Sequence, residues 1–116
     1  MASKVYLLVR RDLTPDQRLV QACHALVELV HEFTDYDRSG YDPNYQAMHD
    51  WVKEDKTLVV LGVKDQKELE LWEERLTFGK FLYKTFTESH FGTKTAMAIH
   101  PHLPEGFFMR SGLTLL

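Results

Sequence analysis

The stretch KVYLLVRRDLTPDQRLVQACHAL, residues 4–26, decides the fold because it contains a strand and a helix in direct succession. Val5–Val9 are all apolar, which is typical of a strand that is buried on both faces of a sheet. Thr14, Pro15 and Gln17 then form a helix start signal, with a threonine cap, a proline at the first helical position and a glutamine three residues after the cap. The apolar spacing predicts that this helix continues to about Phe33.

The predicted helix has an apolar face and a polar face. The side chains expected to face the core are Leu19, Ala22, Cys23, Leu26, Val30 and Phe33, with Val20 and Val27 beside them. Those expected to face outward are Gln17, Arg18, Gln21, His24, Glu28, His31 and Glu32. Cys23 is therefore expected to be a buried structural thiol rather than a nucleophile. His24 is either an ordinary surface histidine or a catalytic group, since an imidazole can exchange a proton near neutral pH.

The rest of the chain, after a polar break at Asp35–Gly40, follows the order helix, strand, helix, strand, strand. The expected elements are a helix from Asp42-Pro43, a strand at Thr57–Val63, a helix from Asp65 that ends before Gly79, and strands at Phe81–Thr87 and Thr93–Ile99. This order predicts an α/β fold whose four-stranded mixed sheet is covered on both faces. The first two strands are expected to be parallel through a right-handed crossover, and the last two antiparallel.

Length and composition limit the possible classes of protein. The chain has 116 residues, a formal charge of −3 and a single cysteine, which indicates one domain without a disulfide framework. Its longest apolar runs, Val5–Val9 and Leu58–Val63, are too short to span a membrane, so a cytoplasmic location is expected. The net charge argues against coating of nucleic acid by bulk charge, although it leaves a local basic patch open.

Histidines near the end of the chain give only a weak metal signal. His100-Pro101-His102 has no cysteine or acidic residue at ligand spacing, and no metal site is expected there. Residues 102–116 form an apolar tail after a domain expected to span residues 1–101. Phe107-Phe108 in this tail could stack on bases, but docking on the domain or on a partner subunit is the preferred interpretation.

Two motifs in the opening stretch resemble those of a known family. Arg10-Arg11-Asp12-Leu13 at the end of the first strand and Gln21-Ala22-Cys23-His24-Ala25 in the helix are similar to motifs of the type II peptidyl-tRNA hydrolases. Later segments follow in the same order, with Asp55–Val63 before an acidic helix and Ala96-Met97-Ala98-Ile99-His100-Pro101 after a pair of threonines. The resemblance covers about residues 3–101.

This resemblance implies a three-layer α/β/α sandwich that hydrolyses the ester between a peptide and tRNA. It also implies that no cofactor is needed and that a homodimer is possible. The residues expected to carry the catalysis are His24, Gln21, Glu88, Thr87 and Thr93. His24 would act as general base or hydrogen-bond donor, and Glu88 would orient it if the loop before the last strand lies over the first helix. A solvated carboxylate and ordinary strand threonines are the alternative interpretations of Glu88, Thr87 and Thr93.

Contacts to tRNA phosphates are expected from Arg10, Arg11, Arg18, Lys84 and Lys94. The helix at Glu68–Glu74 is too acidic to face phosphates, so nucleic acid is expected to approach from one side only. Scattered basic residues that only solvate the surface are the alternative.

The sequence departs from the family pattern at two positions. Gln17 stands where the typical family has a lysine, and Tyr83 stands where it has an aspartate, which resembles a divergent branch of the family. Two rival functions therefore stay open. One is a non-catalytic descendant that binds tRNA or a protein, and the other is an interaction domain that self-associates through its tail.

Overall fold

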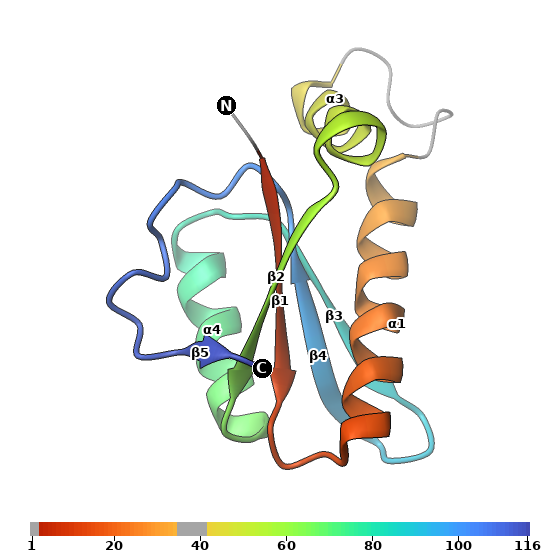
Figure 1. Ribbon diagram of the computed structural model, residues 1–116, viewed down its shortest axis with the longest axis vertical. Helices are drawn as coiled ribbons and strands as arrows, with labels where there is room; N and C mark the ends of the chain where they lie inside the picture. Colours follow the sequence, from red (N-terminus) through yellow and green to blue (C-terminus); the bar gives the residue numbers. More distant parts are fainter. Residues whose placement is uncertain (1–2, 35–41) are drawn as a thin grey trace.

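Helices lie on both faces of one mixed sheet in the computed structural model, which describes residues 3–34 and 42–116 (Figure 1). The elements in chain order are β1 (Lys4–Arg10), α1 (Pro15–Phe33), α3 (Pro43–Asp50), the π-helical turn η1 (Trp51–Asp55), β2 (Thr57–Val63), α4 (Gln66–Phe78), β3 (Tyr83–Glu88), β4 (Thr93–Ile99) and β5 (Thr114–Leu115). The predicted break at Asp35–Gly40 lies outside the described residues. No helix in the two described ranges is long and apolar enough to cross a membrane.

The sheet has the strand order β3-β4-β1-β2-β5. β1 and β2 are parallel and β3 and β4 are antiparallel, as predicted, and β4 also pairs antiparallel with β1. The prediction of four strands is wrong, because the tail adds β5 to the outer edge of β2. β5 has only two residues, and a strand this short carries no detectable sequence period. It forms through backbone pairing with Leu61 and Gly62.

Capping residues start the helices where the sequence predicts. The side chain of Thr14 accepts a hydrogen bond from the Gln17 N–H, and the Gln17 side chain accepts one from the Thr14 N–H, so the capping box is complete. The carboxylates of Asp42 and Asp65 accept hydrogen bonds from backbone N–H groups in the first turns of α3 and α4. The caps at Thr14 and Asp65 fix the points at which α1 and α4 begin after the carboxyl ends of β1 and β2.

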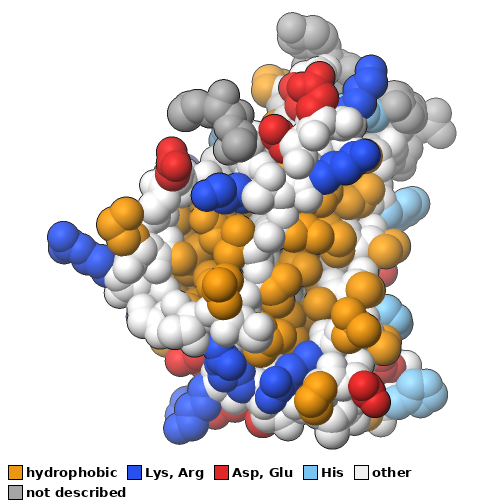
Figure 2. Space-filling view, viewed as in Figure 1, with side chains coloured by type: hydrophobic (Ala, Val, Ile, Leu, Met, Phe, Trp, Pro, Cys, Tyr) orange, Lys and Arg blue, Asp and Glu red, His pale blue; other side chains and the backbone are white. Residues whose placement is uncertain are grey.

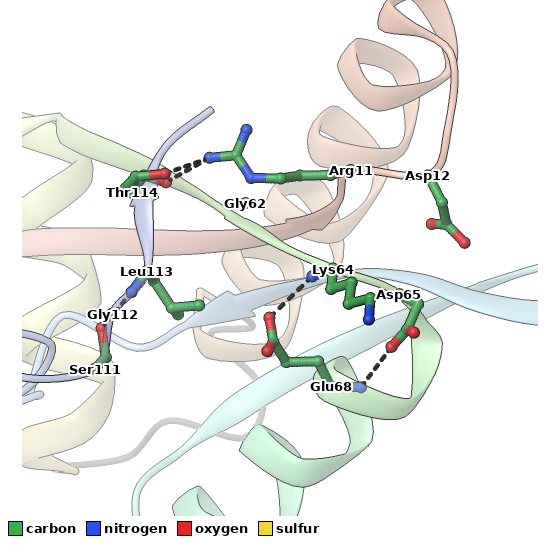
Figure 3. A pocket seen from close by; sticks show the side chains of 10 residues that line it. All are labelled: Arg11, Asp12, Gly62, Lys64, Asp65, Glu68, Ser111, Gly112, Leu113 and Thr114. Atoms are coloured by element: carbon green, nitrogen blue, oxygen red, sulfur yellow. Dashed lines mark hydrogen bonds between the residues drawn. The ribbon is translucent and has the colours of Figure 1, made fainter.

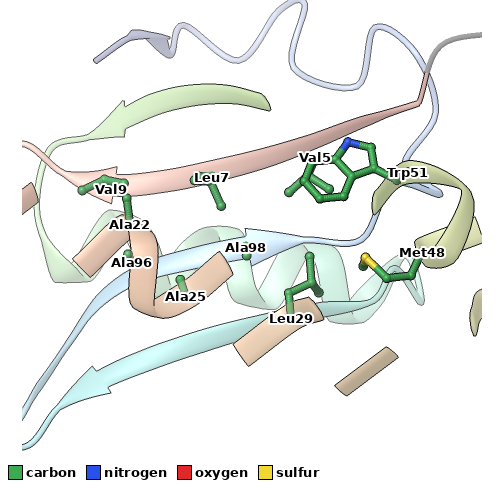
Figure 4. Close-up of a cluster of buried hydrophobic side chains, with 10 residues drawn as sticks. All are labelled: Val5, Leu7, Val9, Ala22, Ala25, Leu29, Met48, Trp51, Ala96 and Ala98. Atoms are coloured by element: carbon green, nitrogen blue, oxygen red, sulfur yellow. The ribbon is translucent and has the colours of Figure 1, made fainter. Parts of the chain in front are cut away.

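The two faces of the sheet bury two separate cores. Between the sheet and α1, α3 and η1 lie Val5, Leu7, Val9, Ala22, Ala25, Leu29, Met48, Trp51, Ala96 and Ala98 (Figure 4). On the other face, Leu8 and Met97 pack against α4 and against Phe108 of the tail. Trp51 and Trp72 are buried, one in each core. The tail therefore docks on the domain itself, where the Phe108 ring contacts Tyr6 and Trp72.

The orientation of α1 differs from the predicted one. Gln21, expected to face outward, is buried, whereas Leu19, Val20, Cys23 and Val27, expected to face or flank the core, are exposed. The helix presents the small residues Ala22 and Ala25 to the sheet, opposite Ala96 and Ala98 of β4. Small residues on both elements allow close packing, so shape rather than hydrophobicity sets the rotation of the helix.

Candidate active site

Gln21 on α1 forms the centre of a polar chain that leads from the core to the surface. Its side chain is only 3% exposed. The amide oxygen accepts a hydrogen bond from the Thr95 hydroxyl at 2.7 Å, and the amide nitrogen donates to the Glu88 carboxylate at 2.9 Å. Because one partner is a donor and the other can only accept, the orientation of the amide is fixed. Gln21 is therefore a polar side chain with a structural reason to be buried.

Thr95 takes its place in this chain because β4 contains an irregularity. Phe86 pairs with Ala96 and Thr87 pairs with Lys94, so Thr95 is an extra residue with no partner on β3. Without the extra residue, Thr95 would lie on the same face as Met97, against α4. The bulge turns its side chain toward α1 instead, where it is fully buried.

Glu88 lies at the end of β3, where the chain turns back into β4. One carboxylate oxygen accepts from Gln21, and the other accepts from the backbone N–H of His90 at 3.3 Å. The hydrogen bond from Gln21 is the largest cause that lowers the pKa of Glu88, and the His90 N–H and the nearby His90 and His24 side chains act in the same direction. The carboxylate is therefore ionised at neutral pH.

His24 stands one helical turn after Gln21 and is exposed. Its ring packs edge-on against Phe86 of β3, with the ring centroids 4.5 Å apart. β3 packs against α1, and its last residue, Glu88, accepts a hydrogen bond from Gln21 and not from His24. Of the causes that lower the pKa of Glu88, the charge of His24 is the smallest. His24 packs on Phe86 of β3 and Glu88 bonds to Gln21 of α1, so an imidazole and a carboxylate both lie where β3 meets α1, which suits acid–base chemistry.

The two threonines proposed for the site lie apart from it. Thr87 is exposed and pairs with Lys94 on the far side of the bulge. The Thr93 hydroxyl accepts a hydrogen bond from Arg10 at 3.2 Å. The structure thus brings together Gln21, His24 and Glu88 and adds Thr95, which the sequence reasoning missed.

The predicted basic residues lie at one end of the sheet, with one exception, and most of them make bonds within the protein. Arg10 forms an ion pair with Asp12 at 2.8 Å. Arg18 donates to the backbone oxygens of Leu13 and Arg11. Lys84 is half-buried on β3, away from that end. The ammonium of Lys94 contacts Glu73 at 2.8 Å and Glu70 at 3.4 Å, which raises the pKa of Lys94 and directs it toward α4.

Arg11 lies beside an open hollow of about 570 Å³ at the carboxyl ends of β1 and β2 (Figure 3). Residues from both strand ends, from the first turn of α4 and from the tail line this hollow: Arg11, Asp12, Gly62, Lys64, Asp65, Glu68, Ser111, Gly112, Leu113 and Thr114. The Arg11 side chain crosses β2 at Gly62 and donates to the Thr114 hydroxyl and to the backbone oxygens of Thr114 and Leu115. A side chain at position 62 would overlap the guanidinium, so glycine permits this crossing.

His100, the buried histidine of the His100-Pro101-His102 segment, is bonded at both ring nitrogens. Nδ1 accepts from the His102 N–H at 3.1 Å, so Nε2 carries the proton and donates to the Asn44 carbonyl at 2.9 Å. Burial lowers the pKa of His100. Within residues 3–34 and 42–116, no group of three or more histidine, cysteine or acidic side chains has a metal-binding arrangement. His100 therefore joins the start of α3 to the end of β4.

The comparison with protein families gives a match over most of the chain. A family model described as peptidyl-tRNA hydrolase PTH2 matches residues 3–106, which is most of the chain. No curated protein matches the chain significantly. The matched range includes α1, β3 and β4, and so Gln21, His24, Glu88 and Thr95.

Proposed function

The chain belongs to the peptidyl-tRNA hydrolase PTH2 family, and from this premise we propose that it hydrolyses the ester bond between a peptide and tRNA. The observation that carries the proposal is the series of hydrogen bonds from Thr95 through Gln21 to Glu88, which ends near His24 at the surface. These hydrogen bonds hold the Glu88 carboxylate in a fixed position where β3 meets α1, and a fixed carboxylate near an imidazole can support acid–base catalysis.

The proposed reaction uses His24 as general base. Its imidazole takes a proton from a water molecule whose oxygen bonds to the ester carbonyl carbon. The bond from that carbon to the ribose oxygen then breaks, and the protonated His24 returns the proton to this leaving oxygen. The Glu88 carboxylate stabilises the imidazolium through its negative charge, while Gln21 and Thr95 hold the carboxylate in place.

The two departures from the family pattern, at Gln17 and Tyr83, support the proposal that the chain is a divergent member of the family. The Gln17 side chain caps α1, and the Tyr83 hydroxyl shares a hydrogen bond with Thr77 at 2.7 Å, so neither position offers a charged group. Glu88 is then the carboxylate that replaces the aspartate of the typical family. Thr87 and Thr93 have no bond to the cluster, and the geometry favours Thr95 in their place.

For tRNA, the proposal places phosphate contacts at Arg10, Arg11 and Arg18, which surround the junction of β1 and α1. Lys94 is a weaker candidate because two glutamates already contact its ammonium. Bound phosphates would have to compete with the internal partners of the arginines. Binding that weakens steeply with added salt would support this assignment.

The test is release of the blocked amino acid from N-acetyl-aminoacyl-tRNA, measured for the wild-type chain and for His24→Ala and Glu88→Gln. His31→Ala is the matched control, since His31 is an exposed histidine two turns further along α1. We expect both site variants to lose at least about tenfold in rate, and the control to retain it. Unchanged release by His24→Ala would refute the role of this residue. Retained tRNA binding without any release by the wild type would favour the non-catalytic alternative.

A further inference from the structure

The outer edge of β3 has no strand partner in the described part of the chain. β3 ends the sheet on the side away from β5, and it pairs with β4 alone. The carbonyls of Phe86 and Glu88 accept hydrogen bonds from β4 and from the turn before it. Because the direction of these groups alternates along a strand, the backbone N–H and C=O groups of Tyr83, Thr85 and Thr87 face the open side.

The helices leave room for another strand beside β3. α1 packs most closely on β4, one strand inward from the edge, and α4 packs on β4, β1 and β2. A second copy that pairs with β3 through a twofold axis perpendicular to the sheet keeps its α1 on the same face. The two α1 helices are then about three strand spacings apart, roughly 14 Å. Packed helices lie about 8–10 Å apart, so these two do not collide.

The sequence of β3 is complementary to itself. Its last five residues, Lys84–Glu88, read KTFTE, with a threonine on either side of Phe86 and opposite charges at the two ends. In an antiparallel pair of such strands centred on Phe86, each lysine lies opposite a glutamate and each Thr85 lies opposite a Thr87. Opposite charges and threonine pairs at facing positions stabilise a sheet. This register also brings the outward backbone groups of Thr85 and Thr87 into hydrogen-bonded positions.

The two charges limit which strand can pair with this edge. Charged side chains on an edge strand oppose pairing with other chains in general. Lys84 is half-buried and forms no ion pair with any residue that the structure describes, and it shares the α1 face of the strand with Phe86 and Glu88. Both donors to the Glu88 carboxylate, Gln21 and the His90 N–H, are neutral groups. A second copy supplies a lysine for each glutamate and a glutamate for each lysine.

The opposite edge of the sheet, at β2, offers a second copy no comparable strand. Figure 2 views that edge and shows Lys and Arg side chains below its hydrophobic area. Arg11 passes over Gly62, and β5 already pairs with this end of β2. The carbonyls of Thr57 and Val60 accept hydrogen bonds from within the chain. The pairing of two copies is therefore argued for β3 and not for β2.

We propose that β3 is the interface between two copies of this chain, which pair antiparallel about Phe86 and join their sheets into one. Lys84 of each copy lies opposite Glu88 of the other, and the two Phe86 side chains face each other on the α1 side. The interface shares Glu88 with the proposed catalytic cluster. Its test therefore measures association and not hydrolysis, so that either proposal can fail without the other.

The experiment is sedimentation equilibrium of the full chain over a range of concentrations. Lys84→Glu and Glu88→Lys each place like charges at facing positions, so each variant should dimerise at least about tenfold more weakly than the wild type. An equal mixture of the two variants should regain the dimer, because every glutamate of one variant at these positions faces a lysine of the other. This recovery distinguishes lost pairing from misfolding. Lys53→Glu is the matched control, since Lys53 is an exposed lysine on η1, which leads into β2 at the opposite edge.

Hydrogen exchange tests the register. The amides of Thr85 and Thr87 face the open edge, so their exchange should slow as the protein concentration rises. The amide of Phe86, which already faces β4, should change little. Any of three results would overturn the proposal: a wild-type chain that stays monomeric up to about 1 mM, a dimer that Lys84→Glu weakens no more than Lys53→Glu does, or a mixture of the two charge variants that stays monomeric.

Discussion

Replacement of Thr95 by valine tests the buried part of the candidate site. The change keeps the shape of the side chain and removes the hydroxyl that donates to Gln21 at 2.7 Å. The amide oxygen of Gln21 then has no donor in a position that water hardly reaches, since Gln21 is 3% exposed. A buried acceptor without a partner costs about 1–3 kcal/mol. We expect the melting temperature to fall by roughly 4–12 °C, because each kcal/mol corresponds to about 4 °C or more in a domain of this size.

The assay is thermal and urea unfolding followed by circular dichroism. Thr85→Val is the matched control, because its hydroxyl also donates to one side chain, the Glu73 carboxylate, but on the α4 face. Glu73 keeps its ion pair with Lys94, so we expect the control to lose less than about 1 kcal/mol. In the double variant Thr95→Val/Gln21→Leu, both polar partners are gone, and part of the lost stability should return.

Three results would refute the reasoning. Thr95→Val could be as stable as the wild type, it could lose no more than the control, or the double variant could be less stable than the sum of the single changes. The same variants separate structure from catalysis. If the hydroxyl holds the amide for Glu88, Thr95→Val should also lower kcat at temperatures at which the variant is fully folded, whereas Thr85→Val should not.

Three further predictions test other parts of the fold. Leu29→Ala should lower the free energy of unfolding by about 2–5 kcal/mol because Leu29 is fully buried. Leu19→Ala should lower it by less than about 0.5 kcal/mol because Leu19 is 68% exposed. Equal losses of stability in urea unfolding would contradict the observed rotation of α1. Gly62→Ala should displace the Arg11 side chain and speed hydrogen exchange of the tail amides. Adding Arg11→Ala to this variant should change the exchange rate little, and additive effects of the two substitutions would disprove the passage of Arg11 over Gly62. Burial lowers the pKa of His100 in the folded chain, so the unfolded state binds the proton more readily, and the free energy of unfolding should fall as the pH drops below about 6.5. This decline, measured by urea unfolding at a series of pH values, should be smaller in His100→Gln, and an identical decline would exclude the contribution of His100.

Local patterns made the main elements predictable from the sequence. The capping box at Thr14 and the apolar run Val5–Val9 depend on residues close together in the chain, and both appear where expected. The rotation of α1 was missed because hydrophobicity favours Leu19 over Gln21 for the core. Gln21 is buried because of Thr95, a contact 74 residues away, and no local pattern reports it. β5 was missed for a similar reason, since it depends on an arginine more than 100 residues earlier.

The candidate site was predictable only where it coincides with the family motif. Gln21 and His24 lie in that motif, and Glu88 was found as the nearest carboxylate. Thr95 could have been found only by recognising the bulge, because strict alternation along β4 assigns its side chain to the opposite face. A bulge changes the register by one residue, and such a change is not visible in a single short strand sequence.

The packing of α1 and the chemistry of the site are consequences of one arrangement. Ala22 and Ala25 allow the helix to approach β4 closely, and this approach brings Gln21 within reach of Thr95. A larger side chain at either alanine would separate helix and strand, and the amide would lose the hydroxyl that orients it. The exposure of Leu19 on the same helix results from the way α1 is rotated against the sheet, and it is not by itself evidence of a binding surface.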